Sequence, residues 1–389
     1  MAANTKIVVI GGGFAGIQAV KALIRSVRDS DITLIDRNPY ATMLPALPDV
    51  LSGRVPRQEI TRPLKDIFDD RVTCVEDESA VIDLPNRTVH GTSGEYSYDY
   101  LIIATGSKPN FFGFTPEGGT LHTLDSFPAA ERLREALTEA VAAESPHPFI
   151  IVGGGYTGLE TAACVRHGYE GYNESLPVIV LEKQDDILPM VSARERTKVR
   201  AYLESIDVEL RTGTSLERLT DDRAILSDGS EHANPVVCWT AGMQGSSGDK
   251  AGDQHVTRDK RFKTNEFLQI EDHPEVYVAG DDAALSDGNT VLRRAVNFAF
   301  YSGRRAGRNC AAQIRGRRQR PFRPADLGWV IPLGDISLGR LFGAIPIGTG
   351  SLGLRIHYAM SAFRHFGVQQ AREFVKTALV LRRGPDRPV

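Results

Sequence analysis

The 389-residue sequence contains only four cysteines, and none of them has a partner nearby in the chain. Cys74, Cys164, Cys238 and Cys310 are each more than seventy positions from the next. The sequence therefore lacks the closely spaced pairs of a local zinc site or of a redox-active disulfide. The nine histidines show no ligand spacing either, so we predict no metal site. Buried free thiols in a reducing compartment are the expected state of such cysteines.

Long apolar runs are also missing. No stretch reaches the ~18 apolar residues that a membrane-spanning helix needs. The first residues, MAANTK, do not have the charged, apolar and small-residue regions of a signal peptide. We therefore expect a cytoplasmic protein. The length predicts two or three domains, and the composition, 41% hydrophobic and 24% charged, is that of a globular protein.

Acidic residues are scarce at one end of the chain. Residues 293–389 hold 18 Lys and Arg against 4 Asp and Glu, although the whole sequence has a net charge of −3. Residues 293–323 contain ten arginines and no acid. Such a run is either a solvated basic face or a surface for an anionic partner, and its length favours the partner. No nucleic-acid-binding motif accompanies it, so nucleic acid is not expected.

A glycine-rich turn occurs twice. In the first copy an apolar strand, KIVVI, leads through Gly11, Gly13 and Gly16 into a helix, and the next strand ends at Asp36. Gly11 allows the tight turn, Gly13 lets a pyrophosphate approach the backbone, and Gly16 permits close packing of helix and strand. The helix N-terminus attracts phosphate, and an acid at the second strand end accepts hydrogen bonds from a ribose. This arrangement predicts a bound dinucleotide.

The second copy begins with the strand FIIV and continues through Gly153, Gly155 and Gly158 into another helix. The following strand, LPVIVLE, ends at Glu182. An acid in this place favours NADH over NADPH, because it repels a 2′-phosphate. Lys183, directly after it, weakens that preference.

Three further segments give the two turns a family context: YDYLIIATGSKPN from Tyr98, VVCWTAGM from Val236 and HPEVYVAGDDAAL from His273. In this order they resemble the two-dinucleotide-binding flavoproteins, the pyridine nucleotide-disulfide oxidoreductase superfamily. The resemblance implies an α/β fold with two Rossmann-like domains. An FAD domain, residues 1–112 and 245–325, would be interrupted by an NAD(P)H domain at 113–244, and a C-terminal region would follow at 326–389.

Within that superfamily, TLIDRNPYATMLPALPDVLSG, GGGYTGLETA and LRRAVNFAFYSGRRAGRN resemble segments of type II NADH:quinone oxidoreductases and the apoptosis-inducing-factor-like quinone reductases. This resemblance implies hydride transfer from NADH to FAD and transfer of two electrons to a quinone, without proton pumping. It implies an FAD site of Gly11, Gly13, Phe14, Ala15, Gly16, Asp36, Arg37, Pro45, Val81, Ala104, Thr105, Gly106, Gly280 and Asp281. The implied NADH site is Gly153, Gly155, Tyr156, Thr157, Gly158, Glu182, Ala241 and Gly242, and Glu160 would face the nicotinamide and flavin rings as the catalytic residue.

The electron acceptor is less well specified. Where the family usually presents glutamines, this sequence has Asn297 and Tyr301, with Phe298 and Phe300 alongside. These side chains could hold a quinone ring by stacking, or they could pack only against the flavin domain. The alternatives to a quinone reductase are a reductase of a soluble electron carrier, such as a small iron–sulfur protein, and a redox-sensing flavoprotein.

The tail from Leu354 reads as one or two basic amphipathic helices. An anionic membrane is the predicted partner of this region, which would bind the protein peripherally to the inner face of the cytoplasmic membrane. The apolar stripe could instead pack on the protein's own core or on a second subunit, as in a homodimer.

Overall fold

The computed structural model describes residues 4–347, apart from positions 69, 173, 253–254, 289, 335 and 343–344, and beyond them only Gly353 and Tyr358. The predicted amphipathic helix from Leu354 therefore lies outside the described residues, except for Tyr358. Among the helices that are described, none is long and apolar enough to cross a membrane.

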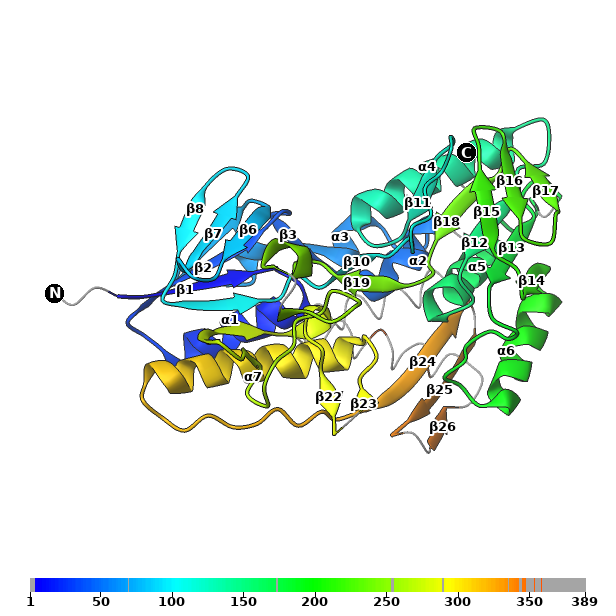
Figure 1. Ribbon diagram of the computed structural model, residues 1–389. Coiled ribbons are helices and arrows are strands. Elements are labelled where there is room, and N and C mark those ends of the chain that lie inside the picture. The colour runs from blue at the N-terminus through cyan, green and yellow to red at the C-terminus, as the bar shows by residue number, and fades with distance from the viewer. Residues whose placement is uncertain are drawn as a thin grey trace.

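The first sheet has six strands in the order β20-β21-β9-β1-β2-β5. All neighbours are parallel except β20 and β21. Four strands come from the N-terminal part and two from a later part, so the chain leaves this sheet and returns to it (Figure 1). The strands are β1 Thr5–Ile10, β2 Ser30–Asp36, β5 Val72–Glu76, β9 Tyr100–Ile103, β20 Gln269–Ile270 and β21 His273–Val278.

Two helices, α1 Phe14–Ser26 and α7 Val296–Ile314, lie side by side on one face of this sheet (Figure 1). The other elements of this part are short. They are β3 Tyr40–Thr42, α2 Leu47–Leu51, α3 Arg57–Ile60, β4 Thr61–Pro63, β6 Ser79–Asp83, β7 Thr88–Gly91, β8 Glu95–Ser97, β22 Ser286–Asp287 and β23 Thr290–Val291, with the 3-10 turns η1 Leu44–Ala46, η2 Leu64–Asp66, η3 Gly248–Lys250 and η5 Gly280–Asp282.

The second sheet has five parallel strands in the order β11-β18-β12-β13-β14. Its central strand, β12 Phe149–Val152, is buried throughout, because helices cover one face and a small sheet the other. The other strands are β11 Leu121–Thr123, β13 Val178–Glu182, β14 Val208–Thr212 and β18 Val236–Trp239. The surrounding elements are α4 Phe127–Ala142, α5 Tyr156–Gly168, α6 Ala193–Ser205, β15 Leu216–Leu219, β16 Arg223–Leu226 and β17 Glu231–Ala233.

The two sheets are joined by a pair of antiparallel strands, β10 Ser107–Pro109 and β19 Met243–Gly245. One carries the chain from the first sheet to the second, and the other carries it back. A last three-stranded sheet, made of β24 Gly328–Leu333, β25 Ile336–Leu341 and β26 Ile345–Ile347, packs through β24 on α5. The predicted fold class, an α/β protein with two Rossmann-like units, is confirmed.

Candidate active site

The first glycine turn is shaped by two close contacts. Gly11 has φ +100°, and a Cβ there would lie 2.3 Å from the carbonyl oxygen of Ala104. A Cβ on Gly16 would lie 1.8 Å from the carbonyl oxygen of Gly11, so α1 packs directly on the turn. Gly13 instead faces open space, with nothing within 4 Å of a Cβ placed on it. The turn is closed on the protein side and open where a phosphate would lie.

Asp36 ends β2 and bonds to the same turn. Its Oδ2 accepts a hydrogen bond from the Gly12 N–H at 2.6 Å, and its Oδ1 accepts one from the Asn38 N–H at 2.8 Å. Burial raises the pKa of Asp36, and these hydrogen bonds offset only part of the rise. The Asn38 side-chain amide also donates to Oδ1, at 3.5 Å. Among the residues that the structure describes, Oδ2 accepts only the Gly12 N–H, so this oxygen can still accept from a ribose hydroxyl.

The second turn repeats this geometry. Gly153 has φ +120°, a Cβ on Gly158 would lie 2.0 Å from the carbonyl oxygen of Gly153, and Gly155 faces open space. Glu182 ends β13, and its Oε2 accepts from the Gly154 N–H at 2.8 Å while its Oε1 accepts from the Gln184 N–H at 2.8 Å. The two turns therefore offer equivalent backbone sites for a dinucleotide.

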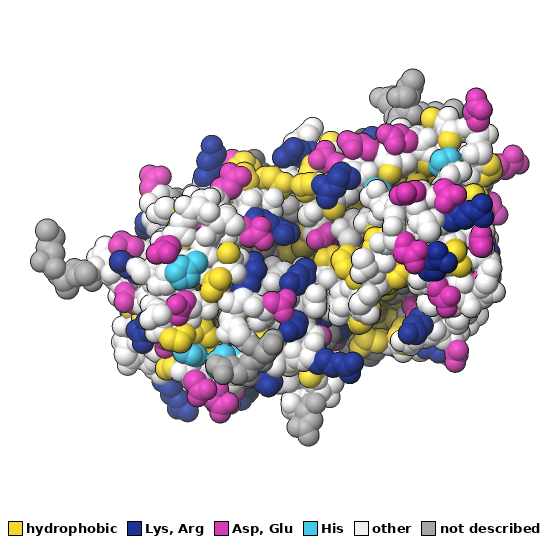
Figure 2. Space-filling view, turned by 45° about the horizontal axis from the view of Figure 1, so that its top comes forward, with side chains coloured by type: hydrophobic (Ala, Val, Ile, Leu, Met, Phe, Trp, Pro, Cys, Tyr) yellow, Lys and Arg dark blue, Asp and Glu magenta, His cyan; other side chains and the backbone are white. Residues whose placement is uncertain are grey.

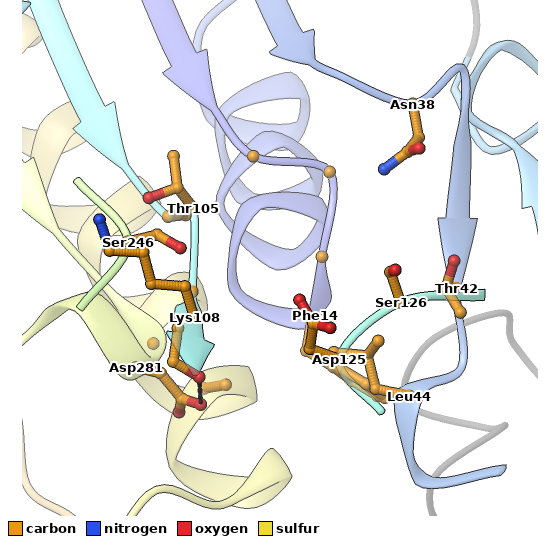
Figure 3. A pocket seen from close by; sticks show the side chains of 18 of the residues that line it. Phe14, Asn38, Thr42, Leu44, Thr105, Lys108, Asp125, Ser126, Ser246 and Asp281 are labelled. Carbon is orange, nitrogen blue, oxygen red and sulfur yellow. Dashed lines mark hydrogen bonds between the residues drawn. The ribbon is translucent and has the colours of Figure 1, made fainter. Parts of the chain in front are cut away.

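One cavity of about 560 Å³ is lined by residues of both units. Figure 3 shows how separate segments face it, with Asn38 and Thr42 on one side and Thr105, Ser246 and Asp281 on the other. The predicted site residues that line it are Gly11, Gly13, Phe14, Ala15, Asp36, Arg37, Pro45, Ala104, Thr105, Gly106, Gly280 and Asp281 from the FAD set, Thr157 from the NADH set, and Glu160.

The cavity fits a bound flavin dinucleotide in two respects. Four basic residues line it: Arg37, Lys108, Lys250 and Arg294. Figure 2 shows Lys and Arg side chains around a hollow in the middle of the face that it draws. Two buried polar atoms on its wall, Oε1 of Glu160 and Nε of Arg294, have no hydrogen-bond partner among the described residues. Buried polar atoms of this kind are normally paired, so a ligand with polar groups suits the cavity.

Two predicted FAD residues lie off the cavity wall. Gly16 sits behind the turn against Gly11. Val81 is 49% exposed on β6, whereas the preceding residues Asp77, Glu78 and Ser79 line the cavity. Because β6 places successive side chains on opposite sides, the register of this short strand decides which residues face the cavity.

Beside the predicted Thr105 and Asp281, the crossing of the two connecting strands holds Asp282, Ser246 and Ser247, which were not predicted. Asp282 is fully buried, and it accepts hydrogen bonds from the Thr105 hydroxyl and from the N–H groups of Ser246 and Ser247. Burial raises the pKa of Asp282 to about 6, although these donors act against it. The neighbouring Asp281 accepts from the Ser107 hydroxyl at 3.1 Å, the bond drawn in Figure 3. Asp281 thus faces the cavity, and Asp282 forms hydrogen bonds to both connecting segments, to Thr105 before β10 and to Ser246 after β19.

Most of the predicted NADH set surrounds the second turn rather than the cavity. Gly153, Gly155, Gly158, Ala241 and Gly242 lie around the ends of β12 and β18. The Tyr156 ring packs edge-on against Trp329, 5.8 Å between ring centroids. Trp239, which was not predicted, lines the cavity and stacks on Phe114 at 5.4 Å. Trp239 stands in the VVCWTAGM segment, but the sequence gives no signal that its ring lines the cavity.

None of the four predicted acceptor residues lines the cavity, whose wall on this side is Ala295, Val296 and Ala299. Two are buried in other contacts. The Asn297 amide donates to the carbonyl oxygen of Ala325 at 2.9 Å, and the Phe298 ring lies under the Arg293 guanidinium at 5.4 Å. Phe300 and Tyr301 are half-buried and pack edge-to-face, 5.3 Å between centroids.

Behind Glu160 lies a second buried carboxyl group. Asp49, on α2, is fully buried, accepts a hydrogen bond from the Tyr358 hydroxyl and lies 3.6 Å from Arg54. Burial, and then the charge of Asp49, raise the pKa of Glu160 well above its ordinary value. Glu160 is 9% exposed. The cavity therefore ends at a carboxyl group that holds its proton more strongly than usual.

No redox-active disulfide stands beside the cavity. All four cysteines are free thiols, three of them buried, and none lines the cavity wall. In the part of the chain that the structure describes, no group of three or more His, Cys, Asp or Glu side chains could hold a metal ion.

The hydrogen bonds of Asp77, which lines the cavity, indicate that the stability of the fold is sensitive to acid. Asp77 accepts hydrogen bonds from the hydroxyls of Thr92 and Tyr96, both at 2.7 Å. Burial alone would raise its pKa, but these bonds and the N–H groups of Ser93 and Glu78 lower the pKa to about 2. Its stabilising effect is therefore present above the unfolded pKa of about 3.9 and lost as the pH falls through 2.

We expect Asp77→Asn to lower the melting temperature at pH 7 and to have a smaller effect at pH 2 to 3, measured by thermal unfolding at each pH. An equal loss at both pH values would contradict the charged role of Asp77.

Comparison with known proteins gives the site its context. The family described as Pyridine nucleotide-disulphide oxidoreductase matches residues 5–301. The type II NADH:quinone oxidoreductase of Staphylococcus saprophyticus is 25% identical over 355 residues, which is 85% of this chain and 87% of that protein. The structure of NDH2 from Plasmodium falciparum in complex with NADH superposes with a TM-score of 0.83 at 13% identity and covers 99% of both chains. The sulfide:quinone oxidoreductase of Aquifex aeolicus superposes with a TM-score of 0.78 at 19% identity, covering 95% of this chain and 92% of that one. These two structural likenesses concern the fold.

Proposed function

Because this chain belongs to the pyridine nucleotide-disulphide oxidoreductase family, we propose that it is an FAD-dependent NADH:quinone oxidoreductase that does not pump protons. The observation that carries the proposal is the shared cavity. Thr157 and Glu160 of the second unit line the same space as Gly13 and Asp36 of the first. A nucleotide on each turn would therefore bring its reactive ring to the same place.

FAD would bind with its pyrophosphate at Gly13 and the N-terminus of α1, its adenosine ribose at Asp36, and its ribityl chain near Asp281. When bound, it supplies the chemistry of the site by accepting a hydride and passing on electrons. The protein holds the turn open and places Arg37, Lys250 and Glu160 on the wall of the same cavity, where they would contact and orient the bound cofactor.

NADH would bind at Gly155 and the N-terminus of α5, with its ribose at Glu182. The quinone is supported by the names of the relatives and by the absence of a cysteine pair at the cavity. For its head group we propose the outer turn of α7 at Phe300 and Tyr301, with Asn297 and Phe298 as supporting residues. The domain boundaries 1–112, 113–244, 245–325 and 326–389 also remain proposals, as do a homodimer and peripheral attachment to the inner face of the membrane.

Glu182→Gln is expected to weaken the preference for NADH. The substitution removes the charge that repels a 2′-phosphate, so the ratio of kcat/KM for NADH to that for NADPH should fall by roughly ten- to a hundredfold. Steady-state kinetics with both nucleotides measures the ratio. Glu217→Gln, an exposed glutamate of the same unit, is the matched control. An unchanged ratio would mean that Glu182 does not read the ribose.

The function itself is tested by anaerobic stopped-flow mixing with NADH, followed by mixing with a short-chain quinone. Flavin bleaching and then reoxidation by the quinone within one turnover time is the expected result. Bleaching without a response to quinone would reject the acceptor, and rapid reoxidation by an acidic iron–sulfur protein would identify a carrier reductase. Slow turnover with every acceptor, with tight binding of NAD to the reduced protein, would indicate a sensor.

A further inference from the structure

We propose that the outer face of α1 and α7 is a docking surface for the anionic headgroups of a phospholipid bilayer. Six basic residues form this surface, which we call the α1–α7 basic surface: Lys21, Arg25, Arg304, Arg305, Arg308 and Arg320. It lies on the two helices that pack on the first sheet, and it is separate from the C-terminal tail that begins at Leu354. The choice of lipid as the partner rests on the proposed quinone acceptor.

Close packing of the two helices creates the surface. Gly303 and Gly307 are one turn apart on α7, and they face Ala15 and Ala19 of α1. A Cβ on Gly303 would lie 2.1 Å from the Ala15 carbonyl oxygen, and one on Gly307 would lie 2.4 Å from that of Ala19. The helices therefore touch backbone to backbone, which is possible only with small residues at the contact. Figure 1 shows them side by side under the first sheet.

This contact brings the basic side chains of both helices together. Lys21 and Arg25 are one turn apart on α1, as are Arg304 and Arg308 on α7, so each pair lies on one face. Burial, and then the charges of Arg304, Arg305, Arg25 and Arg320, lower the pKa of Arg308. The charges of both helices thus act on one another.

The surface is not neutralised from within the protein. Throughout the described part of the chain, Arg25, Arg304, Arg305 and Arg308 form no ion pair with an acid. Other arginines of the same run behave differently. Arg293 pairs with Asp326 and Arg294 with Asp259, and both of these lie at the cavity end of α7. A group of repelling, unpaired arginines is stabilised when an external anion binds to it.

The position of the surface favours phospholipid over an acidic protein. Five of the six residues are arginines, and arginine binds phosphates and carboxylates alike through two parallel hydrogen bonds, so the composition fits either anion. One rigid helix, α7, connects the surface to the cavity, because its first turn supplies Val296 and Ala299 to the cavity wall. A lipid-bound surface would therefore hold the cavity at a fixed distance from a membrane that contains the acceptor.

Sedimentation of the full-length, FAD-loaded protein with vesicles tests the proposal. Wild type is expected to bind vesicles of phosphatidylglycerol and phosphatidylcholine, and to bind pure phosphatidylcholine vesicles much less. Binding should weaken as salt is added. The double variant Arg304→Gln/Arg308→Gln should bind the anionic vesicles roughly thirtyfold more weakly, given the usual effect of each basic residue near such a surface.

The matched control is Arg194→Gln/Lys198→Gln, which removes two exposed charges at the same helical spacing on α6. It should bind like wild type, and the flavin spectrum should be unchanged in both variants. Equal binding by the two double variants would overturn the proposal. The proposal would also be overturned if both variants kept full binding to vesicles and only Arg304→Gln/Arg308→Gln lost binding to poly-glutamate. That result would assign the surface to an acidic protein. Since no NADH or quinone is used, the result does not depend on catalytic activity.

Discussion

Gly158→Ala is expected to slow reduction of the flavin strongly at ordinary NADH concentrations while the flavin stays bound. A Cβ at this position would lie 2.0 Å from the carbonyl oxygen of Gly153 and 2.9 Å from the Thr240 hydroxyl. Neither atom can move without opening the turn that would carry the nucleotide pyrophosphate. Overpacking of this kind typically costs about 1–3 kcal/mol, so the apparent affinity for NADH should fall roughly ten- to a hundredfold or more. Stopped-flow reduction at a series of NADH concentrations measures it.

Gly155→Ala is the companion variant, because a Cβ there meets nothing within 4 Å. This variant should fold as well as wild type, and its loss of affinity should come only from the methyl group that faces the pyrophosphate. Retention of the visible flavin spectrum in both variants would show that the first unit is intact. If Gly158→Ala bound NADH normally, the second turn would not be the nucleotide site.

The two glycine turns could be predicted from the sequence because their physics is local. Gly11, Gly16 and Asp36 act within one strand–turn–helix–strand unit, and the distances between them are set by short segments of backbone. The same holds for Gly153 and Glu182. In each unit the acid lies at the end of the second strand, as predicted, and it also accepts a hydrogen bond from the turn, Asp36 from the Gly12 N–H and Glu182 from the Gly154 N–H.

The residues that sequence reasoning missed all depend on contacts between distant segments. Asp282 joins Thr105 to Ser246, and Tyr358 reaches Asp49 from 309 positions away. Trp239 enters the cavity only because the second sheet is positioned by β10 and β19. No periodicity or spacing encodes such pairs. The predicted acceptor residues fail for the same reason. Asn297 has a side chain that could bind a quinone, but its amide donates a hydrogen bond to the distant Ala325 carbonyl oxygen instead.

Because Asp49 lies behind Glu160, we expect the rate of hydride transfer from NADH to the flavin to fall as the pH rises. Burial and the Asp49 charge raise the pKa of Glu160, so it stays protonated above the range in which an ordinary glutamate ionises. As the pH rises through this higher pKa, Glu160 gains a negative charge next to the cavity. A hydride also brings negative charge, so reduction by NADH should slow with rising pH. A repulsion of about 1.4 kcal/mol corresponds to tenfold.

Glu160→Gln keeps the size of the protonated side chain and cannot ionise. Its rate of flavin reduction should match that of wild type at low pH and stay level where the wild-type rate falls. Asp49→Asn removes the neighbouring charge, so the fall in rate should move to lower pH than in wild type. Stopped-flow reduction across the pH range measures both shifts. A fall at the same pH in Glu160→Gln and wild type would assign the limit to another group, whereas an unmoved fall in Asp49→Asn would show that burial alone sets the pKa of Glu160.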